Sequence, residues 1–165
     1  MRVLGIDTSL RSSGVAVVEE RGTKLVAVAH GAISCSRNYS FSDCLKRLHD
    51  ELAGFIATHR PEQAALEGIF YCKNVRSAVA LGHARGVAIA VCALAGLPVY
   101  EYPPRKVKQA VAGYGAAEKA QVRKMTMRLL GLNVEPDEDA GDALAIAICH
   151  LHNRTIHSII APQPI

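Results

Sequence analysis

The 165-residue sequence lacks the features that would mark a membrane protein or a secreted protein. Its longest stretch without a charged residue, residues 86–100, has 15 residues, fewer than the roughly 20 that a helix needs to span a bilayer. At its start, charged residues lie at both ends of a four-residue apolar run, which is too short for a secretory signal peptide. The sequence therefore predicts a soluble protein of the cytoplasm.

Cysteine patterns that indicate disulfides or zinc are also missing. The five cysteines form no C-x-x-C pair, and an odd number of cysteines cannot form a complete set of disulfides. Cys149, His150 and His152 are residue types that bind zinc, but no second spaced pair accompanies them. We therefore expect free thiols and no zinc site.

Charge is present but unevenly distributed. The net charge is only +4, from 19 Lys and Arg against 15 Asp and Glu. Residues 101–128 contain seven basic and two acidic side chains, a local charge of +5, whereas residues 135–142 contain five acids and no base. This layout suits an anionic partner, although two solvated surfaces of a soluble protein would look the same.

The length of 165 residues predicts one domain, assigned to residues 1–153, where the last predicted helix ends. Residues 154–165 are expected to be a C-terminal tail. Strands are expected at residues 2–6, 14–18, 24–34, 63–66 and 99–102. Helices are expected over residues 45–56 and on towards Pro61, from Asn74 to about residue 95, from Pro103 or Pro104 to the break at 113–115, at 117–130 and at 138–153. Three antiparallel strands followed by alternating helices and strands predict an α/β fold, with a five-stranded mixed sheet and helices on both faces.

The long helix predicted from Asn74 carries small residues at four-residue spacing. They are Ala78, Gly82, Gly86 and Ala90, and they form a smooth stripe. Such a stripe permits close approach of another backbone, so we expect it to pack on the sheet. The alternative is that it packs against a partner subunit.

Four carboxylates stand where the predicted elements would bring them together. Asp7 and Glu67 each follow a short apolar strand, so neither is a simple solubilising residue. Asp139 and Asp142 have i, i+3 spacing and share one face near the start of the last helix. Small residues surround this second pair, which permits close approach to the sheet. The neighbouring acids are explained by the helix dipole alone; they are Glu135, Asp137 and Glu138.

Convergent carboxylates need cations or protons, because two charges about 4 Å apart repel by about 4 kcal/mol at an effective dielectric constant of about 20. Ligands that are all oxygen suit hard ions such as Mg²⁺. Two such ions would activate a water and stabilise the leaving oxygen of a phosphodiester. No Walker phosphate loop and no serine or cysteine nucleophile beside a histidine base offers a competing chemistry.

Six motifs in a fixed order carry a resemblance to a known family, and together they span residues 1 to about 152. They are LGID at 4–7, EGIF with KN at 67–74, LGHARG at 81–86, VKQ at 107–109, AEKAQV at 117–122 and DAGDALAIA at 139–147. In this order they resemble the RuvC family of bacterial Holliday junction endonucleases, which have an RNase H-like fold.

The resemblance implies a function and a set of catalytic residues. Two Mg²⁺ ions per active site, or Mn²⁺ in their place, would be bound by the catalytic carboxylates Asp7, Glu67, Asp139 and Asp142. A homodimer would nick two opposing strands of a four-way junction symmetrically and leave ligatable 5′-phosphates. It would act in homologous recombination and DNA repair with the RuvAB branch-migration complex.

The resemblance also implies DNA contacts. Lys108 and Lys119 match positions that bind DNA phosphate, and Phe70 matches an aromatic residue that engages bases at the junction centre. Further cations beside them would extend the same surface; they are Lys73, Arg76 and Arg105. The alternatives are solvated helix faces for the cations and a core position for the phenylalanine.

Two other functions stay open at the level of sequence. Thr8 and Ser9 follow Asp7 where many family members have Pro-Gly. This start is also similar to that of actin-like ATPases and their relatives in tRNA threonylcarbamoyl modification, which are nucleotide-binding proteins. That alternative predicts a second phosphate-binding hairpin and usually a longer chain, and neither is seen. A DNA-binding module without catalysis is the other alternative, which the presence of all four carboxylates disfavours.

Overall fold

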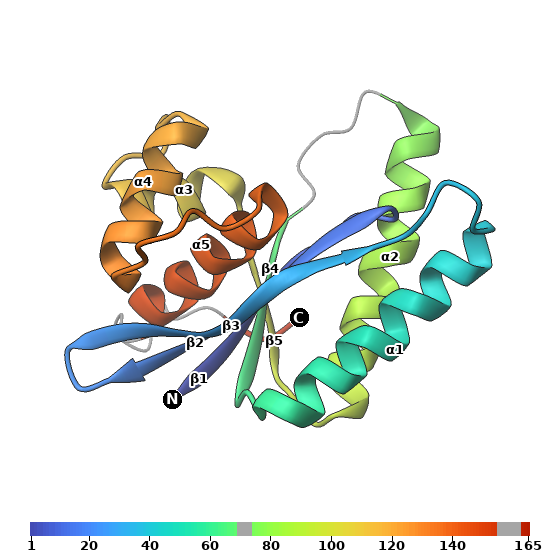
Figure 1. Ribbon diagram of the computed structural model, residues 1–165, viewed down its shortest axis with the longest axis horizontal. Coiled ribbons are helices and arrows are strands. Elements are labelled where there is room, and N and C mark those ends of the chain that lie inside the picture. Colours follow the sequence, from blue (N-terminus) through green and yellow to red (C-terminus); the bar gives the residue numbers. More distant parts are fainter. Residues whose placement is uncertain (69–73, 155–162) are drawn as a thin grey trace.

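A five-stranded mixed sheet runs through the middle of the computed structural model (Figure 1). Its strands are β1 (Arg2–Asp7), β2 (Ser12–Arg21), β3 (Lys24–Ser34), β4 (Gln63–Glu67) and β5 (Val99–Tyr102). They lie in the order β3-β2-β1-β4-β5, with β1, β2 and β3 antiparallel and with β4 and β5 parallel to β1. The structure describes residues 1–68, 74–154 and 163–165.

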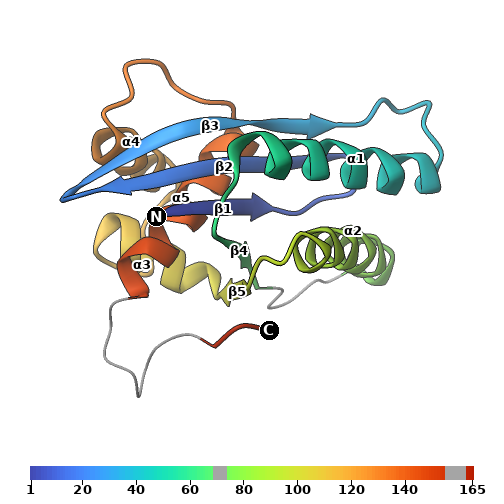
Figure 2. The same ribbon diagram turned by 90° about the horizontal axis from the view of Figure 1, so that it is seen from below.

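Helices cover both faces of this sheet. They are α1 (Phe41–His59), α2 (Val75–Leu94), α3 (Pro104–Ala112), α4 (Lys119–Leu130) and α5 (Glu138–Asn153). Figure 1 shows α1 and α2 on one face and α3, α4 and α5 on the other, and Figure 2 separates the same two groups from a second direction. The predicted α/β fold, with a mixed sheet between two helical layers, is confirmed.

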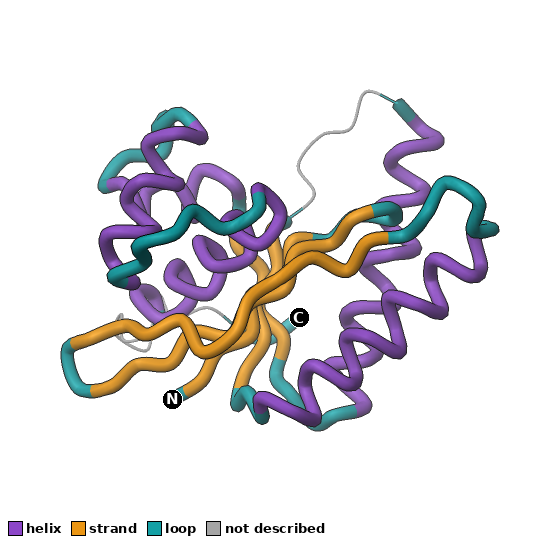
Figure 3. The backbone as a smooth tube through the Cα atoms, viewed as in Figure 1, coloured by secondary structure: helices purple, strands orange, loops and turns teal. Residues whose placement is uncertain are grey.

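The element boundaries differ from the predicted ones mainly where polar residues extend an element. Helix α1 begins well before the apolar periodicity because Ser40 caps it: the Ser40 hydroxyl accepts a hydrogen bond from the Asp43 backbone N–H at 3.1 Å. Asn74 caps α2 in the same way, as predicted. The β2–β3 hairpin extends to the pair Arg21 and Lys24, beyond the alternating apolar residues (Figure 3).

Two separate cores follow from the alternation of side chains along the strands. Leu4 and Ile6 of β1 face α1 and α2 and pack in a cluster with Leu48, Leu52 and other apolar side chains. Their neighbour Val3 points to the opposite face, where α5 supplies a run of buried apolar residues. The sheet is therefore buried on both sides, and its strand ends lie between the two helical layers.

Two glycines allow α5 to lie directly against the strands. A Cβ atom on Gly5 of β1 would lie 2.0 Å from the backbone oxygen of Ala143 and 2.9 Å from the backbone nitrogen of Ala147. A Cβ atom on Gly14 of β2 would lie 1.9 Å from the backbone oxygen of Asp139. The close approach that the small residues of the last helix predicted is thus confirmed, and it also requires the missing side chains on the sheet.

The stripe of small residues on α2 does not pack on the sheet, so that prediction is wrong. The buried residues of α2 include Ala84, Ala88 and Val91, which lie on another side of the helix. Gly82 and Gly86 are exposed, and a Cβ atom on either would meet no atom within 4 Å. The stripe is an open surface of the chain.

Helix α2 is also long and apolar enough, by length and composition alone, to cross a membrane. The sequence prediction was based on the longest stretch without any charged residue, whereas α2 is longer than that stretch and contains Arg76 and Arg85 among its apolar residues. One of these, Arg85, is buried against the sheet side of the helix. Helix α2 packs against α1 and the sheet as a layer of the fold.

The cysteines and histidines near the C-terminus have structural partners. Among the described residues, the cysteines are free thiols, as predicted. His150 is buried and contacts Tyr102 Oη at 2.8 Å and Gln63 Oε1 at 2.6 Å. Burial lowers the pKa of His150 to about 4, so the ring is neutral at pH 7 and both ring nitrogens are used in these bonds. His152 contacts the Ala110 carbonyl instead.

Replacing Gly5 by alanine should destabilise the fold by about 1–3 kcal/mol, because the new methyl group would meet backbone atoms of α5 that cannot move aside cheaply. Urea denaturation measures the free energy of unfolding. The matched control is Gly31→Ala in β3, where a Cβ atom meets nothing within 4 Å and the substitution should be neutral or stabilising. Equal effects of the two substitutions would contradict the close packing of α5.

Candidate active site

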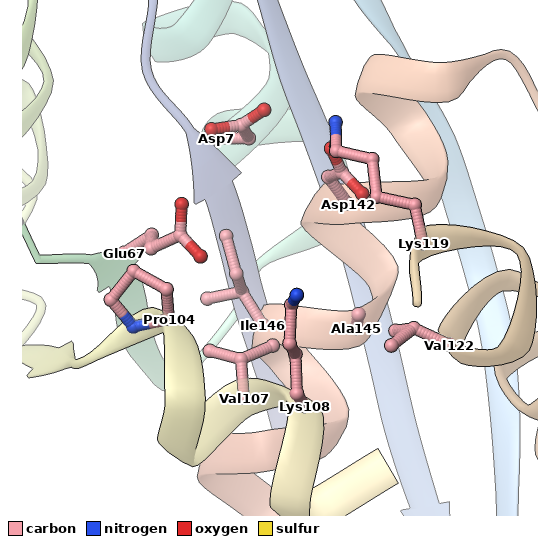
Figure 4. A pocket seen from close by; sticks show the side chains of 10 residues that line it. All are labelled: Asp7, Glu67, Pro104, Val107, Lys108, Lys119, Val122, Asp142, Ala145 and Ile146. Atoms are coloured by element: carbon pink, nitrogen blue, oxygen red, sulfur yellow. The ribbon is translucent and has the colours of Figure 1, made fainter. Parts of the chain in front are cut away.

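A pocket lies at the end of β1 and β4, between the sheet and the helices α3, α4 and α5 (Figure 4). Three carboxylates and two lysines line it, together with apolar side chains. The lining residues are Asp7, Glu67, Pro104, Val107, Lys108, Lys119, Val122, Asp142, Ala145 and Ile146. In Figure 4 the carboxylates come from different elements and surround one space, into which Lys108 points.

Strand pairing places the first two carboxylates side by side. β1 and β4 are parallel neighbours, and Ile6 pairs with Leu66 at the end of their ladder. The next residue on each strand is Asp7 and Glu67, so both side chains leave the sheet at its carboxyl edge. This edge is where parallel strands commonly present functional residues.

The start of α5 adds the remaining carboxylates. The close contact of α5 with Gly14 brings Asp139 and Asp142 to the end of β1. Asp142 lines the pocket, whereas Asp139 lies beside it and accepts a hydrogen bond from the Ser12 hydroxyl. The structure thus brings all four predicted carboxylates into one region, with Asp139 the most peripheral.

Burial and mutual repulsion raise the pKa values of two carboxylates in this cluster. The pKa of Asp7 is raised to about 7, first by burial and then by the negative charges of Asp142, Glu67 and Asp139, while Lys119 opposes the shift. The pKa of Glu67 is also raised, by burial and then by Asp142. The carboxylates therefore need neighbouring positive charge to be ionised together at neutral pH.

Two lysines supply positive charge at the mouth of the pocket. Lys119 Nζ lies 3.0 Å from Glu138 Oε1 and 3.4 Å from Asp142 Oδ2, and these contacts raise the Lys119 pKa, with the Glu138 bond the larger cause. Lys108 approaches from α3 and lowers the pKa of Glu67 against the effect of burial. Glu138, assigned from sequence to the helix dipole alone, is therefore also a partner of Lys119.

Two other predicted DNA contacts, Arg76 and Arg105, do not line this pocket. Arg105 lines an adjoining depression that shares Pro104 and Lys108 with it, so the two hollows form a continuous basic surface. Arg76 is exposed in the first turn of α2. Phe70 and Lys73 lie outside the described residues.

The oxygen-only donor set of the pocket fits a hard divalent ion. The raised pKa of Asp7 shows that a cation would relieve repulsion there. In the described part of the chain, however, no three Asp, Glu, His or Cys side chains are arranged closely enough to hold a metal ion as they stand. The Lys119 ammonium group contacts Asp142 and neutralises part of its charge, as a metal ion would. The carboxylate side chains would have to move slightly to bind a metal ion together.

Sequence reasoning missed the residues that hold these carboxylates in place. Ser12 bonds to Asp139, and Arg85 donates a hydrogen bond to the backbone oxygen of Glu67 at 2.6 Å. Arg85 also forms an ion pair with Glu101. A charged residue in the middle of an apolar helix was the available signal, since a buried arginine needs partners.

Comparison with known proteins decides the family. The family model described as crossover junction endodeoxyribonuclease RuvC matches residues 3–150. The chain belongs to the RuvC family. RuvC of Halorhodospira halophila is 47% identical over 155 residues, which cover 93% of this chain and 92% of that protein. RuvC of Ralstonia pickettii is 46% identical over 166 residues, covering 99% of this chain and 92% of the relative.

Solved structures agree with this assignment to the RuvC family. The structure described as Thermus thermophilus RuvC in complex with Holliday junction substrate has a TM-score of 0.92 and 32% identity, covering 100% of this chain and 99% of that one. The yeast mitochondrial Holliday junction resolvase Ydc2 has a TM-score of 0.63 at 12% identity, covering 91% of this chain and 78% of that one. This second likeness concerns the fold alone, which is the RNase H-like fold of resolvases.

Membership of the RuvC family selects between the functions that the sequence left open. RuvC proteins are metal-dependent nucleases. The family model spans both the Thr8 and Ser9 departure and all four carboxylates. The resemblance to actin-like nucleotide-binding proteins is therefore set aside.

Asp7→Asn should stabilise the metal-free protein at pH 8, on the order of 2–4 kcal/mol, because the raised pKa means that ionised Asp7 destabilises the folded state. The Asp7 carboxyl group binds its proton more tightly in the folded protein than in the unfolded chain. The free energy of unfolding of the wild type therefore falls as the pH rises from about 4 through about 7. The advantage of the variant should vanish near pH 4. Urea denaturation at several pH values, with a chelator present, tests this. A variant less stable than the wild type at pH 8 would contradict the electrostatic account.

Proposed function

We propose that this chain resolves Holliday junctions, as a structure-selective endonuclease that nicks two opposing strands symmetrically and leaves ligatable 5′-phosphates. The observation that carries the proposal is the pocket in which Asp7, Glu67 and Asp142 meet Lys108 and Lys119. Carboxylates beside lysines match a reaction in which metal ions and a phosphate share one site. This activity serves homologous recombination and DNA repair in the cytoplasm.

Asp7, Glu67, Asp139 and Asp142 are proposed as the catalytic carboxylates that hold two Mg²⁺ ions, with Mn²⁺ able to replace them. Bound ions of this kind supply Lewis acidity and a water of lowered pKa for phosphodiester hydrolysis. The chain orients the donor oxygens: strand pairing fixes Asp7 and Glu67, and helix packing fixes the other two. The partly buried position of the pocket strengthens these charge interactions.

Lys108 and Lys119 are proposed to bind the DNA phosphates that flank the scissile bond. Both line the pocket, and the side chain of Lys119 is 66% exposed, so it can move from Asp142 to a phosphate. Arg105 extends the surface along the adjoining depression. Phe70 is proposed to engage bases at the junction centre, and Lys73 and Arg76 are proposed as further DNA contacts.

A homodimer is proposed as the active form, because a four-way junction presents two equivalent strands to be nicked. The stripe Ala78, Gly82, Gly86 and Ala90 on α2, exposed at its last three residues and half-buried at Ala78, is the proposed contact between protomers, since small residues let two helices approach closely. The RuvAB branch-migration complex is the proposed partner. One domain, residues 1–153, carries these functions, and residues 154–165 form the tail.

Asp7→Asn should lower the nicking rate of a synthetic four-way junction about 1,000-fold or more, since the lost ligand removes about 4 kcal/mol of transition-state stabilisation. Junction affinity should remain close to that of the wild type. Gel assays with Mg²⁺ on a four-way junction and on a linear duplex measure both. Full activity of the variant, or wild-type nicking of the linear duplex, would overturn the proposed function.

Lys108→Ala and Lys119→Ala should each weaken junction binding and flatten its salt dependence, reducing the slope of log K against log salt by about one. Binding is measured at several salt concentrations. Lys24→Ala is the control, because Lys24 is exposed at the β2–β3 turn. Unchanged slopes for both variants would mean that Lys108 and Lys119 are solvated surface residues that do not bind DNA phosphate.

Gly86→Leu should convert the dimer into monomers without unfolding them, because the chain leaves the space around Gly86 open. Sedimentation velocity and thermal denaturation measure the two effects. Gly54→Leu, at an equally open glycine on the exposed side of α1, is the matched control and should leave the dimer intact. If Gly86→Leu remained dimeric, the contact between subunits would not involve this stripe.

A further inference from the structure

Arg85 is a buried cation on the sheet side of α2, with 8% of its surface exposed. Its Nη1 donates a hydrogen bond to the backbone oxygen of Glu67 at 2.6 Å, and its Nη2 donates to a carboxylate oxygen of Glu101. The guanidinium therefore ties the last residue of β4 to a side chain of β5. It does not line the pocket that holds the carboxylates.

The end of β4 is fixed from two directions. On one side, the Gly68 backbone N–H donates to the Tyr102 oxygen at 2.8 Å and continues the pairing with β5. On the other side, Arg85 reaches the Glu67 oxygen from α2. Both bonds are made to the peptide group between Glu67 and Gly68, and the pairing of Leu66 with Ile6 and Glu101 holds the residue before Glu67. The direction of the Glu67 side chain is thereby constrained.

Gly68 makes this arrangement possible. A Cβ atom on Gly68 would lie 2.6 Å from Glu101 Oε1 and 3.3 Å from its Cγ. The Glu101 side chain therefore passes over the space that a larger residue would occupy, and it meets the Arg85 guanidinium there. Gly68, Arg85 and Glu101 form one unit around the Glu67 backbone.

We propose that Arg85 is a positioning residue for Glu67: it holds the Glu67 backbone so that the carboxylate faces Asp7 and Asp142 in the pocket. This inference rests on the proposed function, in which Glu67 is a metal ligand. Arg85 acts through Glu67 and touches neither metal nor DNA. Glu101 orients the guanidinium and offsets its charge.

Fold stability alone does not account for a buried arginine that pairs with the exposed Glu101 at this place. An apolar residue of similar size next to Ala84 and Ala88 would fill the same space, and such replacements are often neutral or stabilising. The planar guanidinium instead offers donors in fixed directions, which a flexible ammonium group does not. Groups that orient metal ligands commonly change metal affinity or activity about 10- to 100-fold when they are removed.

The test compares Arg85→Met and Arg85→Lys with the wild-type dimer. Nicking of a four-way junction is measured against Mg²⁺ concentration, Mn²⁺ binding is measured by electron paramagnetic resonance without DNA, and junction affinity is measured without a divalent ion. Arg85→Met should lower nicking at limiting Mg²⁺ and Mn²⁺ affinity about 10- to 100-fold while junction affinity is unchanged. Arg85→Lys, which keeps the charge, should lie between Arg85→Met and the wild type.

Arg154→Met is the matched control. Arg154 pairs with Glu20 in a partly buried ion pair and contacts Met1 Sδ at 3.0 Å, at the opposite end of the sheet. The Arg154→Met variant should be less stable than the wild type but keep the wild-type dependence of nicking on Mg²⁺. A similar change of metal dependence in this control would mean that Arg85 acts only through general stability, and would overturn the proposal.

Glu67→Gln separates the two ways in which the inference could fail. If Glu67→Gln nicks normally, the assignment of Glu67 in the proposed function is wrong. If Glu67→Gln is inactive but the Arg85 variants show wild-type metal dependence, only the positioning role is wrong. Parallel losses of junction binding and nicking would also overturn it. If Arg85→Met does not fold, the same readouts on Arg85→Lys decide the question.

Discussion

The site depends on one packing constraint, the direct contact of α5 with the backbones of β1 and β2. Gly5 and Gly14 leave no side chain between the helix and the sheet, so carbonyl groups of Ala143 and Asp139 lie where Cβ atoms would otherwise be. A helix at the usual distance from a sheet would carry Asp142 away from the ends of β1 and β4. Close packing, normally a matter of stability, here sets the spacing of charged groups.

That spacing has an electrostatic cost which the surrounding residues offset. Burial and three neighbouring carboxylates raise the pKa of Asp7 to about 7, so full ionisation of the cluster at neutral pH requires nearby positive charge. Lys119 supplies some of it through Asp142 and Glu138. A phosphate would compete with these carboxylates for Lys119, and a metal ion would compete with Lys119 for Asp142. If the pocket is the proposed metal and phosphate site, then phosphate binding, metal binding and protonation would be linked equilibria there.

The fold and the carboxylates were predictable because they depend on local patterns. Alternating apolar residues predicted the strands, and the end of a buried strand predicted the place of Asp7 and Glu67. The contacts of Arg85 were not predictable, since Glu101 lies 16 residues further on and only the folded sheet brings the two together. The stripe around Gly86 was misread because small residues suit close packing on either side of a helix. Gly5 and Gly14 gave a usable signal, since glycine within a strand often marks close approach of another backbone.

The order of the elements along the chain has a consequence for synthesis. Asp7 belongs to the first strand, Glu67 to the fourth, and Asp142 to the last helix. A growing polypeptide that has not yet reached α5 therefore contains only part of the pocket, however well its sheet has formed. Incomplete chains and fragments that lack α5 therefore have no assembled cluster of carboxylates.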